Sequence, residues 1–80
     1  MHNPQGGDRL VRTRIRDLRE DRDWTQKELA DRLKISRSAY SAYENGANAL
    51  PLEILIALAD LYQVSVDYLL FRTDFPGMMR

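Results

Sequence analysis

The sequence has no cysteine and a single histidine, His2, so it almost lacks the side chains that bind zinc or act as thiolate nucleophiles. Disulfides and thiolate metal sites are therefore excluded, and we expect no metal and no other cofactor. There is no glycine-rich phosphate loop with its lysine, and the carboxylates are scattered among arginines at surface spacing. Together these absences argue against an enzyme.

Long apolar runs are also missing. The longest wholly apolar stretch is residues 54–59, far shorter than the roughly 20 residues that a membrane-spanning helix needs. The N-terminal segment, MHNPQGGD, is polar and does not have the pattern of a secretory signal. We therefore expect no membrane partner and a cytoplasmic location, with which the lack of cysteine agrees.

A surplus of charge is absent too, because 12 Lys and Arg balance 12 Asp and Glu. Residues 1–48 hold ten basic and eight acidic side chains, a balance of +2, and residues 49–80 hold two and four, a balance of −2. This asymmetry is too small for a broad basic patch to supply affinity for nucleic acid. Binding to an anionic partner would have to depend on local geometry.

The most informative stretch is residues 25–46, which predicts two short helices joined by a tight turn. Thr25 stands at a capping position with Glu28 three residues later, so we expect a helix over Gln26–Leu33. Ser36 caps a second helix, Arg37–Asn45, which Gly46 ends. Two helices, a short turn and a polar outer face on the second helix are typical of a DNA-reading helix-turn-helix.

The rest of the chain predicts three more helices and therefore an all-α, five-helix domain over residues 9–71. Arg9–Arg22 forms the first helix, with a buried face at i, i+4 and i+7. Pro51 opens the fourth helix at its first position, and Ser65 caps the fifth. The core face of the fourth helix comprises Leu52, Leu55, Leu58, Ala59 and Tyr62. Residues 1–8 are expected to be a disordered tail, and residues 72–80 an irregular one.

Several motifs at fixed spacing resemble the lambda-repressor-like helix-turn-helix family, which includes phage repressors and regulators of the xenobiotic-response-element type. The resemblance covers roughly residues 9–70. It implies a transcriptional regulator of bacterial or phage origin, associated with the nucleoid, that binds a pseudo-palindromic operator as a homodimer and represses transcription. The matching residues are Thr25-Gln26, Glu28-Leu29-Ala30, Leu33, Ile35-Ser36, Tyr43-Glu44-Asn45-Gly46, Pro51, Leu55, Ala59 and Val64 to Leu70.

The resemblance also implies a set of DNA-contacting residues in this chain. The outer face of the second motif helix would read bases through Arg37, Ser38, Ser41 and Ala42. Phosphates would be contacted by Gln26, Asn45, Asn48, Lys34 and Arg19. Each of these has a plainer interpretation: a polar helix start for Gln26, turn chemistry for the two asparagines, a solvated side chain for Lys34 and a structural ion pair for Arg19.

Three further points concern an ion pair, the turn and the core of the motif. The resemblance implies an ion pair between Arg19 and Glu44 that ties the first helix to the end of the recognition helix. At Lys34 this sequence departs from the family, which usually has glycine there because the backbone tends to be left-handed. Tyr40 is expected in the core, with its hydroxyl reaching the surface or a partner.

A second apolar stripe on the fourth helix suggests an interface. Ile54, Ala57 and Leu61 recur at i, i+3 and i+7, and aromatic residues follow in the C-terminal part. The expected homodimer interface comprises Ile54, Ala57, Leu61, Tyr68, Phe71 and Phe75. The alternatives are a tail that clamps the same stripe within one chain, and a protein-interaction module, antitoxin-like or a co-regulator, whose DNA binding is secondary.

Overall fold

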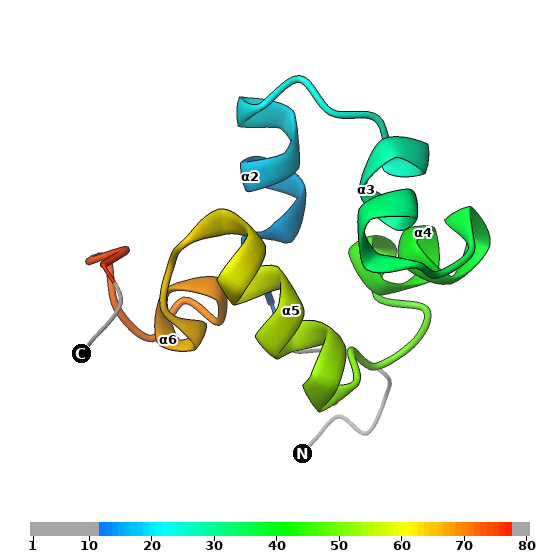
Figure 1. Cartoon of the computed structure of the whole chain (residues 1–80). Helices are drawn as coiled ribbons and strands as arrows, with labels where there is room; N and C mark the ends of the chain where they lie inside the picture. Colours follow the sequence, from blue (N-terminus) through cyan, green and yellow to red (C-terminus); the bar gives the residue numbers. More distant parts are fainter. Residues whose placement is uncertain (1–11, 78–80) are drawn as a thin grey trace, which may run out of the picture.

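The computed structural model describes residues 12–77 and contains five α-helices and no strand in that part of the chain (Figure 1). The predicted all-α fold is confirmed. The tail at residues 1–8 and the last three residues lie outside the described range. The helices are α2 (Ile15–Asp21), α3 (Gln26–Leu33), α4 (Arg37–Asn45), α5 (Leu52–Tyr62) and α6 (Val66–Leu69).

Helices α3 and α4 begin and end at the residues predicted from their caps. The Thr25 hydroxyl accepts a hydrogen bond from the Glu28 backbone N–H at 3.0 Å, and the Glu28 carboxylate accepts one from the Thr25 N–H at 2.7 Å. The Ser36 hydroxyl accepts from the Ala39 N–H at 3.0 Å. Gly46, with φ of 83°, ends α4 in the left-handed conformation. The Thr25 and Ser36 side chains thus satisfy N–H groups in the first turns of α3 and α4 that would otherwise have no partner.

The turn between α3 and α4 has the left-handed backbone that the family resemblance implied for its glycine position. Lys34 has φ of 60° and ψ of 41°, and the next residue, Ile35, donates its N–H to the Ala30 carbonyl at 3.0 Å. A non-glycine residue in this conformation costs about 1 kcal/mol. The chain keeps the helix-turn-helix geometry in spite of that cost.

The predicted start of the first helix is wrong. Helix α2 begins at Ile15, and residues 12–14 are not helical, whereas residues 9–11 lie outside the described part. The reason is a long-range hydrogen bond: the Arg14 N–H donates to the Leu69 carbonyl at 2.9 Å. This bond joins the segment before α2 to α6, so that segment does not continue the helix.

The core lies between α2, α3, α4, α5 and α6, and most of the face predicted for α5 is part of it. The exception is Leu52, which is 67% exposed. It stands at the edge of the buried face in the first turn of α5, after Pro51, which precedes the helix instead of opening it. The buried apolar residues are Ile15, Leu29, Ala30, Tyr40, Leu55, Leu58, Ala59, Tyr62, Val64 and Leu69.

The segment after α6 folds back beside that helix (Figure 1). Ser65 caps α6 by accepting from the Tyr68 N–H at 3.0 Å, and its own N–H donates to the Pro76 carbonyl at 3.0 Å. Arg14 donates to the Thr73 carbonyl at 3.2 Å. The irregular C-terminal segment is therefore held by hydrogen bonds within the chain.

Candidate functional site

The outer face of α4 forms an open hollow of about 240 Å³. The hollow is lined by the four residues expected to read bases, Arg37, Ser38, Ser41 and Ala42, and by Asn45, which was expected to contact a phosphate. Arg37 and Ser38 are exposed in the first turn of the helix, and Asn45 is exposed at its last residue. The hollow therefore presents a guanidinium, two hydroxyls, a methyl and an amide along one helix face.

Behind this face, the carboxylate of Glu44 is fully buried and binds side chains from three helices. Arg19 of α2 donates twice, from Nε at 2.6 Å to Oε2 and from Nη2 at 3.1 Å to Oε1. The Tyr40 hydroxyl donates to Oε2 at 2.5 Å, and the Gln26 amide donates to Oε1 at 3.1 Å. The Glu44 side chain is 0% exposed and that of Arg19 is 13% exposed. The ion pair expected between Arg19 and Glu44 is thus present and fixes α2 to the end of α4, and the Gln26 hydrogen bond fixes α3 to the same carboxylate.

The charges of this cluster are stabilised by their hydrogen bonds. Burial opposes ionisation of Glu44, but the hydrogen bonds from Arg19, Tyr40 and Gln26 outweigh it and lower the pKa of the carboxyl below its ordinary value. The hydrogen bond with Glu44 raises the pKa of Arg19 against the effect of burial. Burial, and then the hydrogen bond to Glu44, raise the pKa of Tyr40. Near neutral pH Glu44 is therefore a carboxylate, Arg19 a guanidinium cation and Tyr40 a neutral phenol.

The residues expected to contact phosphates lie around the two ends of α4. Gln26 opens α3 and is half-buried because its amide is bound to Glu44. Asn45 accepts from the Ala47 N–H at 2.9 Å through its side-chain oxygen, so the turn chemistry proposed for this asparagine is present. Lys34 and Asn48 are exposed. Arg19 also donates to the Trp24 carbonyl at 2.7 Å, so most of its donors are bound within the chain.

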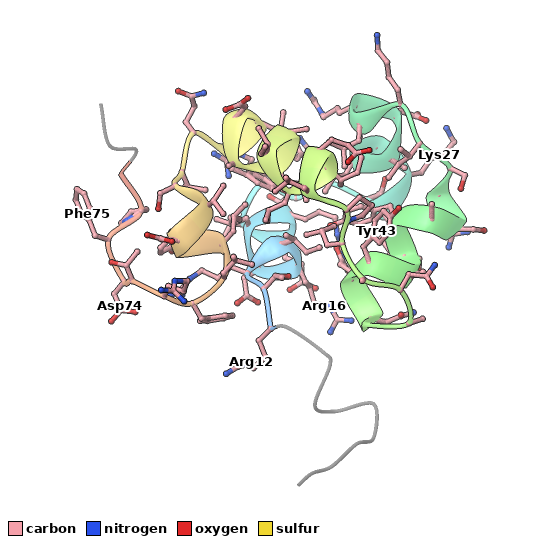
Figure 2. All side chains as sticks on the ribbon, turned by 90° about the horizontal axis from the view of Figure 1, so that it is seen from below. Arg12, Arg16, Lys27, Tyr43, Asp74 and Phe75 are labelled. Carbon is pink, nitrogen blue, oxygen red and sulfur yellow. The ribbon has the colours of Figure 1, made fainter. Side chains whose placement is uncertain are left out.

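The residues expected in a dimer interface differ in exposure. Ile54, Ala57 and Leu61 are half-buried, and two of them, Ile54 and Leu61, pack against the core. Tyr68 is half-buried as well, whereas Phe75 is 64% exposed. Figure 2 shows Phe75 at the edge of the molecule, away from the ribbons of α3 and α4. Two other apolar residues of α5 are exposed: Leu52, which was expected in the core, and Ile56, which belongs to neither predicted stripe.

Sequence patterns also missed Arg14, which holds the C-terminal segment. Its Nε donates to the Tyr68 carbonyl at 2.7 Å, and its guanidinium lies 4.2 Å from the ring centre of Tyr68 and 4.1 Å from that of Phe71. Its Nη2 lies 3.2 Å from an Asp74 carboxylate oxygen. No local periodicity marks these contacts, because the partners lie more than 50 residues along the chain.

Residues 12–77 contain neither a metal-binding cluster nor a membrane-spanning helix. Within that range no group of three or more His, Asp or Glu side chains could hold a metal ion. None of the helices described above has the length and apolar character needed to cross a membrane.

Comparison with known proteins finds a family and several relatives. The family model described as "Helix-turn-helix" matches residues 15–69. The chain is 44% identical over 63 residues to YobD of Bacillus subtilis, described as an uncharacterized HTH-type transcriptional regulator, covering 79% of this chain and 56% of the relative. It is 38% identical over 57 residues to the cryptic phage CTXphi transcriptional repressor RstR of Vibrio cholerae, covering 71% and 51%.

A third relative, the HTH-type transcriptional regulator ImmR of Bacillus subtilis, is 39% identical over 61 residues, which cover 76% of this chain and 48% of the relative. The chain thus spans about half the length of the curated relatives that it matches. No solved structure matches it significantly.

Proposed function

Because this chain belongs to the helix-turn-helix family of transcriptional regulators, we propose that it binds double-stranded DNA sequence-specifically and represses transcription. The observation that carries the proposal is the hollow on the outer face of α4, where the expected base-reading side chains lie together. In this family of folds the second helix of the motif enters the major groove with its N-terminal residues foremost. In this chain that helix is α4.

Base reading depends first on Arg37. Its guanidinium can donate to O6 and N7 of one guanine, which is worth roughly 1–3 kcal/mol of discrimination. Ser38 and Ser41 can bond to bases or phosphates, and the Ala42 methyl can contact thymine. Since this face has only one long polar side chain, the shape and deformability of the DNA supply part of the specificity.

Phosphate contacts position the helix. The N–H groups at the start of α3 point outward beside Gln26 and suit a phosphate, because the positive end of the helix dipole lies there. Lys34 lies exposed in the turn before α4, Asn45 lies exposed at the last residue of α4, and Asn48 lies exposed in the loop after it. Arg19 acts mainly by holding Glu44, with its remaining exposed edge directed to the same backbone.

We further propose a homodimer that binds two half-sites about one helical turn apart on a pseudo-palindrome. The relative RstR is a phage repressor by name, which supports the repressor role. The interface would use the apolar stripe of α5 and the C-terminal aromatics, namely Ile54, Ala57, Leu61, Tyr68, Phe71 and Phe75. A light-scattering mass equal to one chain at high micromolar concentration would contradict the dimer.

A second candidate function is a protein-interaction module, antitoxin-like or a co-regulator. Two observations favour it: the net charge is zero, and Phe75 and Leu52 expose large apolar surfaces. The two functions differ in salt dependence. Binding to DNA releases counterions and weakens steeply as salt rises, whereas an apolar contact between proteins does not.

Gel-shift titration with duplex DNA between about 50 and 200 mM salt separates the two candidates. Loss of affinity with a steep log–log slope supports DNA binding. No binding to any duplex at the lowest salt would contradict it, and would favour a protein partner on the apolar surfaces.

A further inference from the structure

Arg16 is the outermost member of the cluster around Glu44. Its Nε lies 3.5 Å from Glu44 Oε1, and its side chain is 58% exposed, whereas that of Arg19 is 13% exposed. Figure 2 shows the labelled Arg16 between the ribbons of α2 and α4. Arg16 is therefore held near the end of α4 but keeps much of its guanidinium in solvent.

The charge of Arg16 is in excess of what the cluster needs. Glu44 carries one negative charge, and Arg19 already meets both of its oxygens at 2.6 and 3.1 Å. The 3.5 Å contact of Arg16 is longer and lies at the limit of a hydrogen bond. Although the whole chain has no net charge, a surplus cation at a fixed position makes the local surface potential positive.

The position of Arg16 matches the proposed phosphate contacts. Arg16 Nε and the Gln26 amide both donate to the same oxygen of Glu44, so the guanidinium lies beside the start of α3. The next residue after Glu44 is Asn45, which lines the hollow. The exposed cation therefore borders the groove-facing surface at the end opposite Arg37.

We propose that Arg16 is a phosphate-binding residue that adds one backbone contact at the Asn45 end of the interface. This inference rests on the proposed DNA-binding function. Arg16 lies near the end of α4 that is opposite Arg37, and so outside the deepest part of the groove. Its phosphate contact therefore adds affinity without adding sequence preference. Glu44 preorganises the side chain, which reduces the conformational entropy lost on binding.

The test compares salt slopes for the wild type, Arg16→Gln, Arg16→Lys and Arg72→Gln. Arg72 is the matched control: it is an exposed arginine near Asp67, at 3.6 Å, in the segment after α6. Each phosphate contact contributes about 0.9 to the slope of log affinity against log salt. Raising salt fourfold should therefore cost the wild type about 3.5-fold more affinity than Arg16→Gln.

Arg16→Lys keeps the charge and should retain most of the slope, and Arg72→Gln should keep the wild-type slope. The ranking of binding sites should not change in Arg16→Gln, because a phosphate contact reads no base. An Arg16→Gln slope equal to that of the wild type would overturn the inference alone. A wild type that binds no duplex would overturn the proposed function and the inference with it. Thermal unfolding of each variant separates lost contacts from lost folding.

Discussion

Replacing Glu44 with glutamine should destabilise the protein more than any other change of a single charge in residues 12–77. The substitution keeps the size of the side chain but removes its charge and exchanges one acceptor for a donor. The buried Arg19 would lose its counter-charge, and the new amide would meet donors from Arg19, Gln26 and the Tyr40 hydroxyl. A buried charge left without its partner is costly, because it gave up hydration that nothing replaces.

The expected loss is large compared with the stability available. Breaking a buried pair by removing one partner costs about 3–5 kcal/mol. A domain of this size has roughly 4–12 kcal/mol in total, at about 0.05–0.15 kcal/mol per residue. At about 4–8 °C per kcal/mol, a loss of 3 kcal/mol lowers the melting temperature by roughly 12–24 °C.

Thermal unfolding followed by circular dichroism measures this loss, with Glu20→Gln as the control. Glu20 is exposed and lies 4.0 Å from the same arginine, Arg19, so its removal breaks only a surface pair worth about 0–1 kcal/mol. If Glu44→Gln lowered the melting temperature no more than Glu20→Gln, the Glu44 cluster would not hold the helices together.

Three further predictions concern stability. The pKa of Glu44 is lowered from its ordinary 4.5. The stability that the ionised Glu44 contributes is therefore complete above about pH 4.5 and declines as pH falls through the lower pKa of the folded state. Urea midpoints should show this decline in the wild type and much less in Glu44→Gln. Burial raises the pKa of Tyr62 to about 12, so stability should fall between pH 10 and 12. Tyr62→Phe should flatten that fall and stabilise the protein by about 1 kcal/mol, because the buried hydroxyl bonds to none of the described groups; an unchanged alkaline profile would contradict this. Lys34→Gly should raise the urea-derived stability by about 1 kcal/mol by relieving the left-handed backbone, and a loss would show that the lysine side chain matters more.

The helix-turn-helix could be predicted from the sequence because its signals are local. Thr25, Ser36 and Gly46 set the bounds of α3 and α4 through hydrogen bonds and backbone conformations within a few residues. The family match over residues 15–69 confirms the resemblance drawn from the same motifs. A structural feature formed within one turn of helix can therefore be predicted from the sequence.

The remaining features depend on contacts between distant segments. The start of α2 could not be predicted, because Arg14 is bound to residues of α6 and of the segment after it. The Glu44 cluster was predicted only through its pair with Arg19; the contacts of Gln26 and Arg16 with the same carboxylate follow from how three helices meet. Helical periodicity placed Leu52 in the core, but periodicity cannot tell where along a helix its neighbours end.

Whether α4 reads DNA through Arg37 can be measured by selection from random duplex DNA, with the wild type and Arg37→Ala in parallel. We expect the wild type to enrich an inverted repeat with a guanine in each half-site. In the variant, the preference at that guanine should relax by roughly 1–3 kcal/mol. If the wild type enriched no sequence even at low salt, α4 would not be a sequence-reading helix.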